Sequence, residues 1–215
     1  MKYPTHLATI DRFYADCAAA TLPSVSFVDP EFAVISAIGK SLAAVPVLGK
    51  LAARLETVGG DEQAPQDMYY GEAWAHRVVE AVLHSPTWPR TLLIYTYDEH
   101  GGYYDHVPPP AAIEPDSIPP ELTPTDVPGA YNIYGPRVPA VVASPYSKPN
   151  AVTDVVHDHT SVLATIESKW NLPALTYRDA NAPTVIDFLN VSDAAFLSPP
   201  TIQGPSLAGP SGPVK

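Results

Sequence analysis

The sequence predicts an α/β fold in which helices flank a mostly parallel central sheet. The apolar run at 92–97, rich in strand-forming residues, is typical of a strand buried on both faces. A second such run, at 138–144, predicts another strand of parallel type. Before the first run, apolar residues recur at helical spacing from Gly71 onward, and Pro86 and Pro89 stop this helix ahead of the strand. A helix followed by a strand is typical of α/β folds.

Shorter elements are predicted on either side of this unit. Residues 3–20 predict an amphipathic helix packed against the sheet, and its apolar side carries Leu7, Ile10, Phe13, Tyr14 and Cys17. Residues 22–27 predict a short strand that a turn at Asp29 closes. Because Pro46 interrupts 32–58, that segment predicts two short helices, or a helix and a loop, that cover an edge of the core.

The last part of the chain predicts one more helix and a tail. Asp158 is placed as the N-cap of a helix whose apolar positions are Val162, Leu163, Ile166 and Trp170. Residues 201–215 are rich in Pro, Gly and Ser, which predicts a disordered tail after a domain that spans 1–200.

Composition limits the classes of partner. The chain has 215 residues and is 46% hydrophobic, which is enough for one domain with a core. Its 12 basic and 23 acidic residues give a net charge of −11, so nucleic acid is not expected as a partner and an anionic membrane surface is repelled. One cysteine, Cys17, excludes an internal disulfide. No apolar run is long enough for a transmembrane helix, and the first residues lack the apolar core of a signal peptide.

The candidate site lies in residues 91–110, TLLIYTYDEHGGYYDHVPPP. The predicted strand delivers Asp98 and Glu99 onto a turn at Gly101 and Gly102, and in parallel sheets ligands gather at the carboxyl ends of strands. Two adjacent carboxylates with no Lys or Arg near them in sequence repel each other, and a divalent cation relieves that repulsion. The alternative is a solvated acidic turn after a core strand.

The residues leave the identity of the ion open. Two carboxylates suit Mg²⁺, Ca²⁺ or Mn²⁺, whereas a histidine ligand favours Zn²⁺ or Fe. The nearby His100 and His106 keep both possibilities open.

Four stretches carry a resemblance to a known family. TYDEHGGYYDHVPPP, GPRVPAVVASPYSK, DHTSVLATIESKWNLPALTYRDANA and, more loosely, ATLPSVSFVDPEF resemble the bacterial phosphoesterases that include non-haemolytic-type phospholipases C and acid phosphatases, within the alkaline-phosphatase-like superfamily. The resemblance implies an alkaline-phosphatase-like fold and a metal-assisted hydrolase of phosphoesters such as phospholipids. It also implies an exported protein. Asp98 and Glu99 match the family's metal-binding acidic pair, and His100 and His106 are then acid–base groups or neighbours of the metal ligands.

The chain departs from the family pattern in two places. Gln63 stands where relatives often carry a histidine, which is expected to weaken phosphate binding or leaving-group protonation. Residues 1–20 match none of the family segments that carry the nucleophile and further metal ligands. We therefore expect residues 1–200 to be the carboxyl-terminal part of a phosphoesterase domain that a missing amino-terminal portion completes. Thr96, Ser144 and Thr160 are candidate substitute nucleophiles, without an activating base at local spacing.

Two hypotheses of different class follow from these patterns. In the first, the chain belongs to a phosphoester hydrolase and lacks its nucleophile; in the second, it is a catalytically silent metal-binding or interaction module. Whether the substrate is a phosphodiester or a phosphomonoester stays open. Arg137 is expected to pair with an acid of the fold, because it precedes a strand and so lies at the end away from the site. His159, at a helix start, is expected either to pack or to touch the site.

Overall fold

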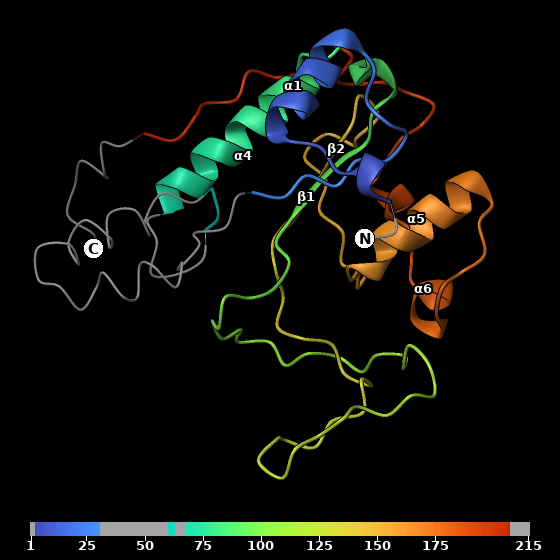
Figure 1. Ribbon diagram of the computed structural model, residues 1–215. Helices are drawn as coiled ribbons and strands as arrows, with labels where there is room; N and C mark the ends of the chain where they lie inside the picture. Colours follow the sequence, from blue (N-terminus) through green and yellow to red (C-terminus); the bar gives the residue numbers. More distant parts are fainter. Residues whose placement is uncertain (1–2, 31–59, 63–67, 207–215) are drawn as a thin grey trace, which may run out of the picture. The chain divides into compact units, whose positions relative to one another are not determined.

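The computed structural model describes residues 3–30, 60–62 and 68–206, which contain both helices and strands (Figure 1). They belong to two compact units, one made of Met1–Pro89 with Pro199–Lys215 and the other of Arg90–Ser198. Each unit is described by itself below.

The first unit contains helices α1, Ile10–Ala19, and α4, Met68–Leu83, which pack against each other. Ala75, Val78 and Val82 are buried on one side of α4, as their helical spacing predicts. Cys17 is the buried residue of α1, and its carbonyl accepts a hydrogen bond of 2.7 Å from the Ser85 hydroxyl. The predicted amphipathic helix is therefore confirmed from Ile10 onward.

Three local predictions in this unit are wrong. A short 3-10 helix, Pro4–His6, precedes α1, and Leu7 is exposed instead of packing on an apolar side. Residues 22–27 form no strand, since Pro23 lacks a backbone donor and Phe27 is exposed. Helix α4 begins at Met68 and not at Gly71.

Some predictions fall on residues that the structure does not describe. The two short helices predicted at 32–58 and the departure at Gln63 lie outside the described residues. Of the predicted disordered tail, 207–215 also lies outside them, whereas 201–206 is described and forms no helix or strand. Gly204 lies against the His76 ring, so this segment packs on α4.

The second unit holds strands β1, Leu93–Thr96, and β2, Ala140–Ala143, which pair antiparallel. Leu93 lies opposite Ala143, and Thr96 lies opposite Ala140. The prediction of a parallel second strand is wrong, and the described residues show no mostly parallel central sheet. A parallel pair needs a crossover connection, usually a helix. Residues 97–139 contain no helix, and this long connection returns to the end of β1 at which it began (Figure 1).

Helix α5, Thr160–Trp170, follows β2 and packs on the short helix α6, Tyr177–Asn181, and on a 3-10 helix, Val185–Phe188. The N-cap of α5 is His159 and not Asp158 as predicted, and His159 makes no side-chain capping bond. Asp158, one residue earlier, still accepts a 2.7 Å hydrogen bond at Oδ1 from the Thr160 backbone N–H. The most buried positions of α5 are Ser161 and Ala164, whereas Trp170, predicted on the apolar face, is exposed.

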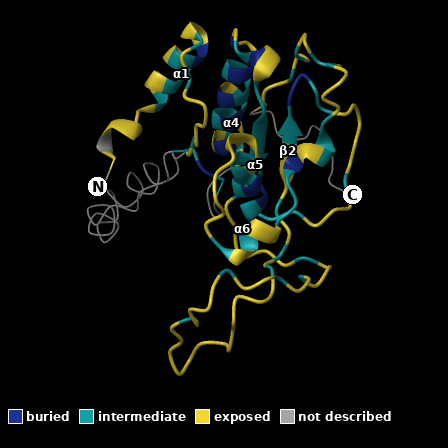
Figure 2. Ribbon diagram, turned by 90° about the vertical axis from the view of Figure 1, so that its right-hand side faces the viewer, coloured by how far each residue is buried: buried dark blue, intermediate teal, exposed yellow. Residues whose placement is uncertain are grey.

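Burial is concentrated on α4 and α5, while the long connection between the strands is exposed along most of its length (Figure 2). None of the described helices is long and apolar enough to cross a bilayer.

Candidate functional site

The site begins where β1 ends. After Thr96 the chain turns, and Asp98 Oδ1 accepts a hydrogen bond from the Glu99 backbone N–H at 3.1 Å. Glu99 Oε2 accepts another from the Gly101 N–H at 2.9 Å. Gly101 and Gly102 have φ of 64° and 77°, which the turn requires and glycine adopts without strain. Both carboxylates are exposed at the end of the strand, where the sequence places them.

Asp98 and Glu99 have the ligand chemistry of a metal site, but the described residues gather no third His, Cys, Asp or Glu side chain beside them. Carboxylate oxygens are the ligands that hard divalent cations prefer, and Asp98 and Glu99 are adjacent and solvent-accessible. The described residues, however, bring together no group of three His, Cys, Asp or Glu side chains with metal-binding geometry. Among the His, Cys, Asp and Glu side chains that the structure describes, only the acidic pair itself is therefore a candidate set of ligands at this turn.

His100 is half-buried and held in one orientation. Its Nδ1 lies 3.0 Å from the carbonyl oxygen of Tyr103. A carbonyl only accepts, so Nδ1 carries the proton. In the neutral ring Nε2 is then the unprotonated nitrogen, the form needed to accept a proton from a reacting group.

A bidentate ion pair joins the two sides of the site. Arg137 Nε and Nη2 donate to the two oxygens of Asp105 at 2.6 and 2.9 Å, and the backbone N–H groups of Arg137 and Val107 also donate to this carboxylate. These hydrogen bonds, those from the Arg137 side chain above all, hold the pKa of Asp105 well below its usual range, and the same ion pair raises the pKa of Arg137. The predicted structural pairing of Arg137 is confirmed.

His106 is held more loosely than His100. Its Nδ1 lies 3.5 Å from Asp105 Oδ1, and 88% of its side-chain surface is exposed. Asp105 already accepts from Arg137, so His106 is an exposed neighbour of the ion pair.

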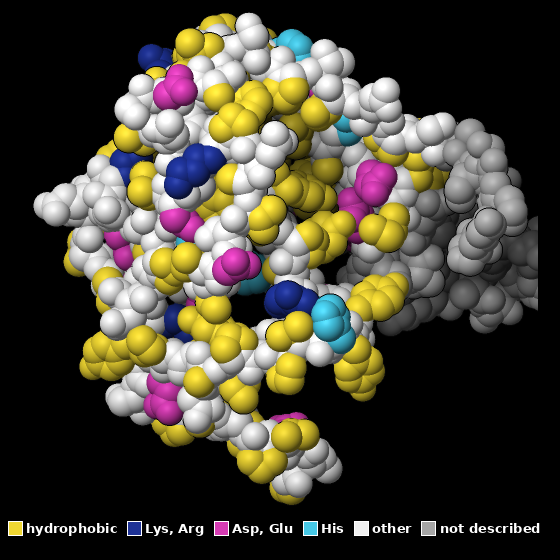
Figure 3. Space-filling view, turned by 180° about the vertical axis from the view of Figure 1, so that it is seen from behind, with side chains coloured by type: hydrophobic (Ala, Val, Ile, Leu, Met, Phe, Trp, Pro, Cys, Tyr) yellow, Lys and Arg dark blue, Asp and Glu magenta, His cyan; other side chains and the backbone are white. Residues whose placement is uncertain are grey.

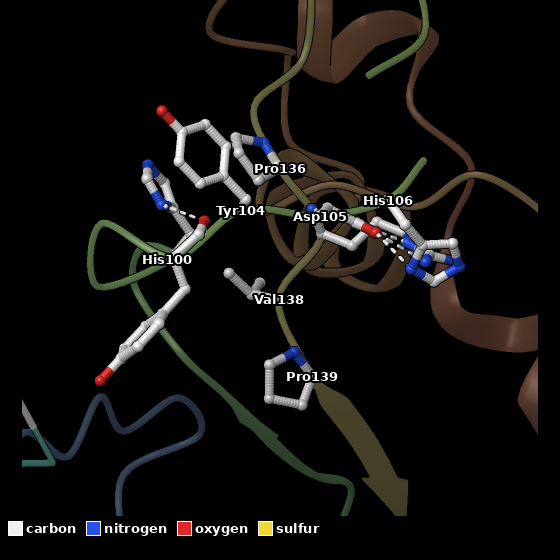
Figure 4. Close-up of a pocket in the computed structure, with 9 residues that line it drawn as sticks. His100, Tyr104, Asp105, His106, Pro136, Val138 and Pro139 are labelled. Atoms are coloured by element: carbon white, nitrogen blue, oxygen red, sulfur yellow. Dashed lines mark hydrogen bonds and ion pairs between the residues drawn. The ribbon is translucent and has the colours of Figure 1, made fainter. Parts of the chain in front are cut away.

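These groups line one cavity of about 440 Å³ (Figure 4). Its lining residues are His100, Tyr103, Tyr104, Asp105, His106, Pro136, Arg137, Val138 and Pro139. In Figure 4, His100 lies on one side of Val138 and His106 on the other. The cavity thus brings together both predicted histidines, whereas Asp98 and Glu99 precede its lining and do not form it.

Arg137 is the residue that sequence reasoning kept away from the site. The prediction assumed parallel strands, so that a residue before the second strand lies at the opposite end from the acidic turn. In the antiparallel pair, Ala140 at the start of β2 lies beside Thr96 at the end of β1. Arg137 therefore reaches the same edge as the turn. A proline-rich connection without helical periodicity was the available signal for antiparallel pairing.

His159 anchors the end of β1. Its Nε2 lies 2.8 Å from the carbonyl oxygen of Tyr97, the residue before Asp98. Nε2 is the protonated nitrogen, because its partner is an acceptor. Of the two roles predicted for His159, the structure shows contact with the backbone that carries the acidic turn.

His157, two residues before His159, has a structural role. His157 Nε2 lies 3.1 Å from Asp187 Oδ2, and its Nδ1 lies 3.3 Å from the Ser161 hydroxyl. Burial opposes ionisation of Asp187, but hydrogen bonds from His157 and Thr153 outweigh it and lower the pKa of this carboxyl. His157 therefore joins α5 to the 3-10 helix and does not line the cavity.

Each candidate nucleophile has a hydrogen-bonded hydroxyl. Thr96 Oγ1 donates to the Pro139 carbonyl at 3.1 Å, and Thr160 Oγ1 donates to Asp158 Oδ1 at 2.5 Å. Ser144 is buried, and its hydroxyl accepts from the Tyr146 N–H at 3.3 Å. None of the three lines the cavity.

Comparisons with known proteins agree on one family. A model described as Phosphoesterase family matches residues 2–173. The chain is 31% identical over 203 residues to Non-specific phospholipase C6 of Arabidopsis thaliana, covering 88% of this chain and 35% of the relative. It is 29% identical over 217 residues to Non-specific phospholipase C4 of the same organism, covering 95% and 36%.

A bacterial relative gives a similar result over a shorter stretch. Phospholipase C A of Mycobacterium tuberculosis is 36% identical over 135 residues, covering 57% of this chain and 25% of the relative. The chain spans about a third of the length of the first two relatives.

Proposed function

Because this chain belongs to the phosphoesterase family, we propose that it forms part of a phosphoester hydrolase that cleaves phospholipids in the manner of a phospholipase C. The observation that carries the proposal is the cavity that Arg137, His100 and His106 line, directly after the acidic turn. The phospholipase C names of the relatives favour a lipid phosphodiester over a phosphomonoester. An alkaline-phosphatase-like architecture for the whole protein belongs to the same proposal.

Arg137 is proposed to bind the phosphoryl group. Asp105 occupies Nε and one hydrogen of Nη2, which leaves both hydrogens of Nη1 and the second of Nη2 for another acceptor. An arginine fork is suited to phosphate oxygens, and its contacts gain strength as charge develops on them. Asp105 fixes the guanidinium, so that little side-chain entropy is lost when the substrate binds.

The two histidines are proposed as acid–base groups, with His100 in the main role and His106 in an assisting one. His100 is fixed by the Tyr103 carbonyl with Nε2 free of a proton in the neutral ring, so it is suited to take up or return a proton at that atom. His106 is exposed and loosely held, so it assists by hydrogen bonding once a substrate covers it.

Asp98 and Glu99 are proposed to hold a divalent metal ion of unknown identity, as the family resemblance implies. When bound, such an ion neutralises charge on a phosphoryl oxygen. The described residues gather no third His, Cys, Asp or Glu side chain at the pair, so we propose that segments outside the described residues contribute further ligands and the hydroxyl nucleophile.

The test compares hydrolysis and metal binding in matched variants. The full chain is assayed with a chromogenic phosphocholine diester and a chromogenic phosphomonoester across several divalent metals, and Mn²⁺ binding is followed by calorimetry. We expect Asp98→Asn with Glu99→Gln to abolish Mn²⁺ binding, whereas Asp116→Asn with Glu121→Gln, two exposed acids of the same connection, leaves it unchanged.

Turnover tests the hydrolase, and Mn²⁺ binding tests the acidic pair. Turnover that Arg137→Gln lowers by about a hundredfold supports the proposal. Mn²⁺ binding without turnover, whichever divalent metal is added, is expected both of a silent module and of a part whose nucleophile lies outside the described residues. Retention of Mn²⁺ binding in the Asp98 and Glu99 double variant contradicts the assignment of the acidic pair.

A further inference from the structure

The connection between β1 and β2 projects from the strands and exposes apolar side chains along its length. Ile118, Leu122 and Val127 are exposed on its outer part, with exposed fractions of 70% and 84% for Ile118 and Val127. Tyr103 and Tyr104 are exposed where it leaves the cavity, and Tyr131 is exposed on its return. Figure 3 shows hydrophobic side chains spread over the projection at the bottom of the view. We call residues 103–133 the apolar arm.

Hydrogen bonds close the apolar arm at its base and attach it to α6. An isolated bridge joins Ala111 to Ile133, and the Tyr134 N–H donates to the Pro110 carbonyl at 3.0 Å, so the arm closes at its neck. Arg178 of α6 donates through Nε to the Ile113 carbonyl at 2.8 Å and through Nη2 to the carbonyl of Tyr131. The arm is therefore held against α6 in one position, and its outer residues are presented to the surroundings.

Its backbone suits a shallow apolar contact. Prolines stand at 108, 109, 110, 115, 119, 120, 124 and 128, and they restrict the chain before any partner binds. The same prolines leave carbonyl groups without ladder partners, and such groups stay solvated in the interfacial region of a bilayer but not in its hydrocarbon core. The arm can thus insert side chains while its backbone stays at headgroup depth.

The charges of the arm discriminate between surfaces. No Lys or Arg occurs between Arg90 and Arg137, whereas Glu114, Asp116 and Glu121 are exposed on the arm. An anionic bilayer is repelled by this pattern. Quaternary ammonium headgroups are attracted, both by carboxylates and by the faces of exposed tyrosine rings.

We propose that the apolar arm docks on a lipid surface with zwitterionic phosphocholine headgroups, with Ile118, Leu122 and Val127 inserted and Tyr103 and Tyr104 beside the headgroup that enters the cavity. This inference rests on the proposed function and adds the surface that brings the substrate to the site. The membrane contact is made by the arm and requires no spanning helix.

Vesicle binding tests the inference without any need for turnover. The full chain is sedimented with vesicles of dioleoyl phosphatidylcholine and, separately, with vesicles of dioleoyl phosphatidylglycerol. Val127→Asp is compared with Val152→Asp, whose site is 91% exposed in the same unit but off the arm. We expect Val127→Asp to weaken partition into phosphatidylcholine vesicles by at least about tenfold, because a buried valine side chain is lost and a charge is added. Val152→Asp is expected to bind as the parent does.

Several outcomes overturn the inference. The inference is wrong if the parent does not bind phosphatidylcholine vesicles, or if Val127→Asp and Val152→Asp weaken that binding equally. It is also wrong if the parent binds phosphatidylglycerol vesicles as strongly as phosphatidylcholine vesicles. Self-association of the parent that Val127→Asp abolishes, without vesicle binding, assigns the arm to a second copy of the chain instead.

Hydrolysis of the soluble phosphocholine diester is measured in parallel to separate the two proposals. Vesicle binding without hydrolysis leaves the docking surface intact and shows that the chain alone does not complete a hydrolytic site. Hydrolysis by a chain that does not bind vesicles supports the proposed function and overturns the docking surface.

Discussion

The Asp105 carboxylate is the most heavily used polar group of the site. It accepts from the Arg137 side chain at 2.6 and 2.9 Å and from two backbone N–H groups, and only 11% of its side-chain surface is exposed. Because both partners lie on the segments that flank the cavity, one ion pair fixes the position of the arginine and the shape of the cavity together.

The Asp105 ion pair is expected to make the free energy of unfolding depend on pH in the acidic range. The folded-state pKa of Asp105 is depressed, so its stabilising effect is present above the unfolded-state pKa of about 4 and is lost as the pH falls toward the lower folded-state value. Asp105→Asn should lower the urea midpoint at pH 6 and flatten its decline between pH 6 and pH 3. Asp154→Asn, an exposed acid of the same unit, is the control. A decline as steep in Asp105→Asn as in the parent would contradict this assignment.

Gly71 is required by the close approach of a neighbouring backbone. A Cβ at this position would lie 2.6 Å from the Asp61 carbonyl oxygen and 2.9 Å from its carbon. Replacing glycine by alanine in a helix gains about 1 kcal/mol, but overpacking against backbone costs about 1–3 kcal/mol.

Gly71→Ala is therefore expected to destabilise the first unit by about 1 kcal/mol, despite the gain in helix propensity. Chemical unfolding followed by circular dichroism measures the change. Glu72→Ala, at the next and exposed position, should stay within about 0.5 kcal/mol of the parent. A stabilised Gly71→Ala variant would mean that Asp61 moves aside without cost.

At the scale of elements, the antiparallel pairing of β1 and β2 decides which segments of the chain lie together at the cavity. Thr96 lies opposite Ala140, so the residues that follow β1 and those that precede β2 share one edge. The apolar arm leaves from and returns to this edge, which places its neck beside the cavity. Helix α5 contributes from the other side through His159 and the Tyr97 carbonyl.

The contact between α5 and β1 is expected to hold the acidic turn in place. His159→Ala removes a hydrogen bond of 2.8 Å and should cost about 0.5–1.5 kcal/mol of stability. Hydrogen exchange at the Glu99 and Gly101 amides should quicken as well, since the carbonyl that precedes the turn is released. His159→Gln, which can donate an amide N–H, should restore part of the protection. Unchanged exchange in His159→Ala would show that the turn is held by its own hydrogen bonds.

At the scale of the whole molecule, the net charge of −11 opposes anionic ligands. This repulsion acts over a distance and is screened by salt, with a Debye length of about 10 Å at 0.1 M. A cavity with one paired arginine and two histidines offsets it only locally.

Affinity for inorganic phosphate is therefore expected to rise a few-fold as salt is raised from about 10 to 100 mM. Affinity for glycerophosphocholine, which carries no net charge, should change little. Calorimetry on the full chain measures both, with potassium chloride as the varied salt. A steady fall in phosphate affinity over this range would contradict the prediction, because it would mean that attraction by Arg137 outweighs repulsion by the net negative charge at the cavity.

The sequence by itself determined the features that depend on neighbouring residues. The apolar run that becomes β1, the acidic turn at Asp98 and Glu99, the helix around Val78, and the start of α5 within two residues of Asp158 all follow from local patterns. The family follows from the same stretches, because its motifs are contiguous. Such features are set by the local backbone preferences and periodicity of a few adjacent side chains.

Only the tertiary structure decided which distant groups meet. Asp105 and Arg137 are 32 residues apart, and Tyr97 and His159 are 62 apart, so neither pair has a local signal. Both depend on the direction in which β2 returns, and an apolar run fits a parallel or an antiparallel neighbour equally well. The antiparallel return follows from the path of the arm between the strands, and that path places Arg137 in the lining of the cavity that His100 and His106 also line.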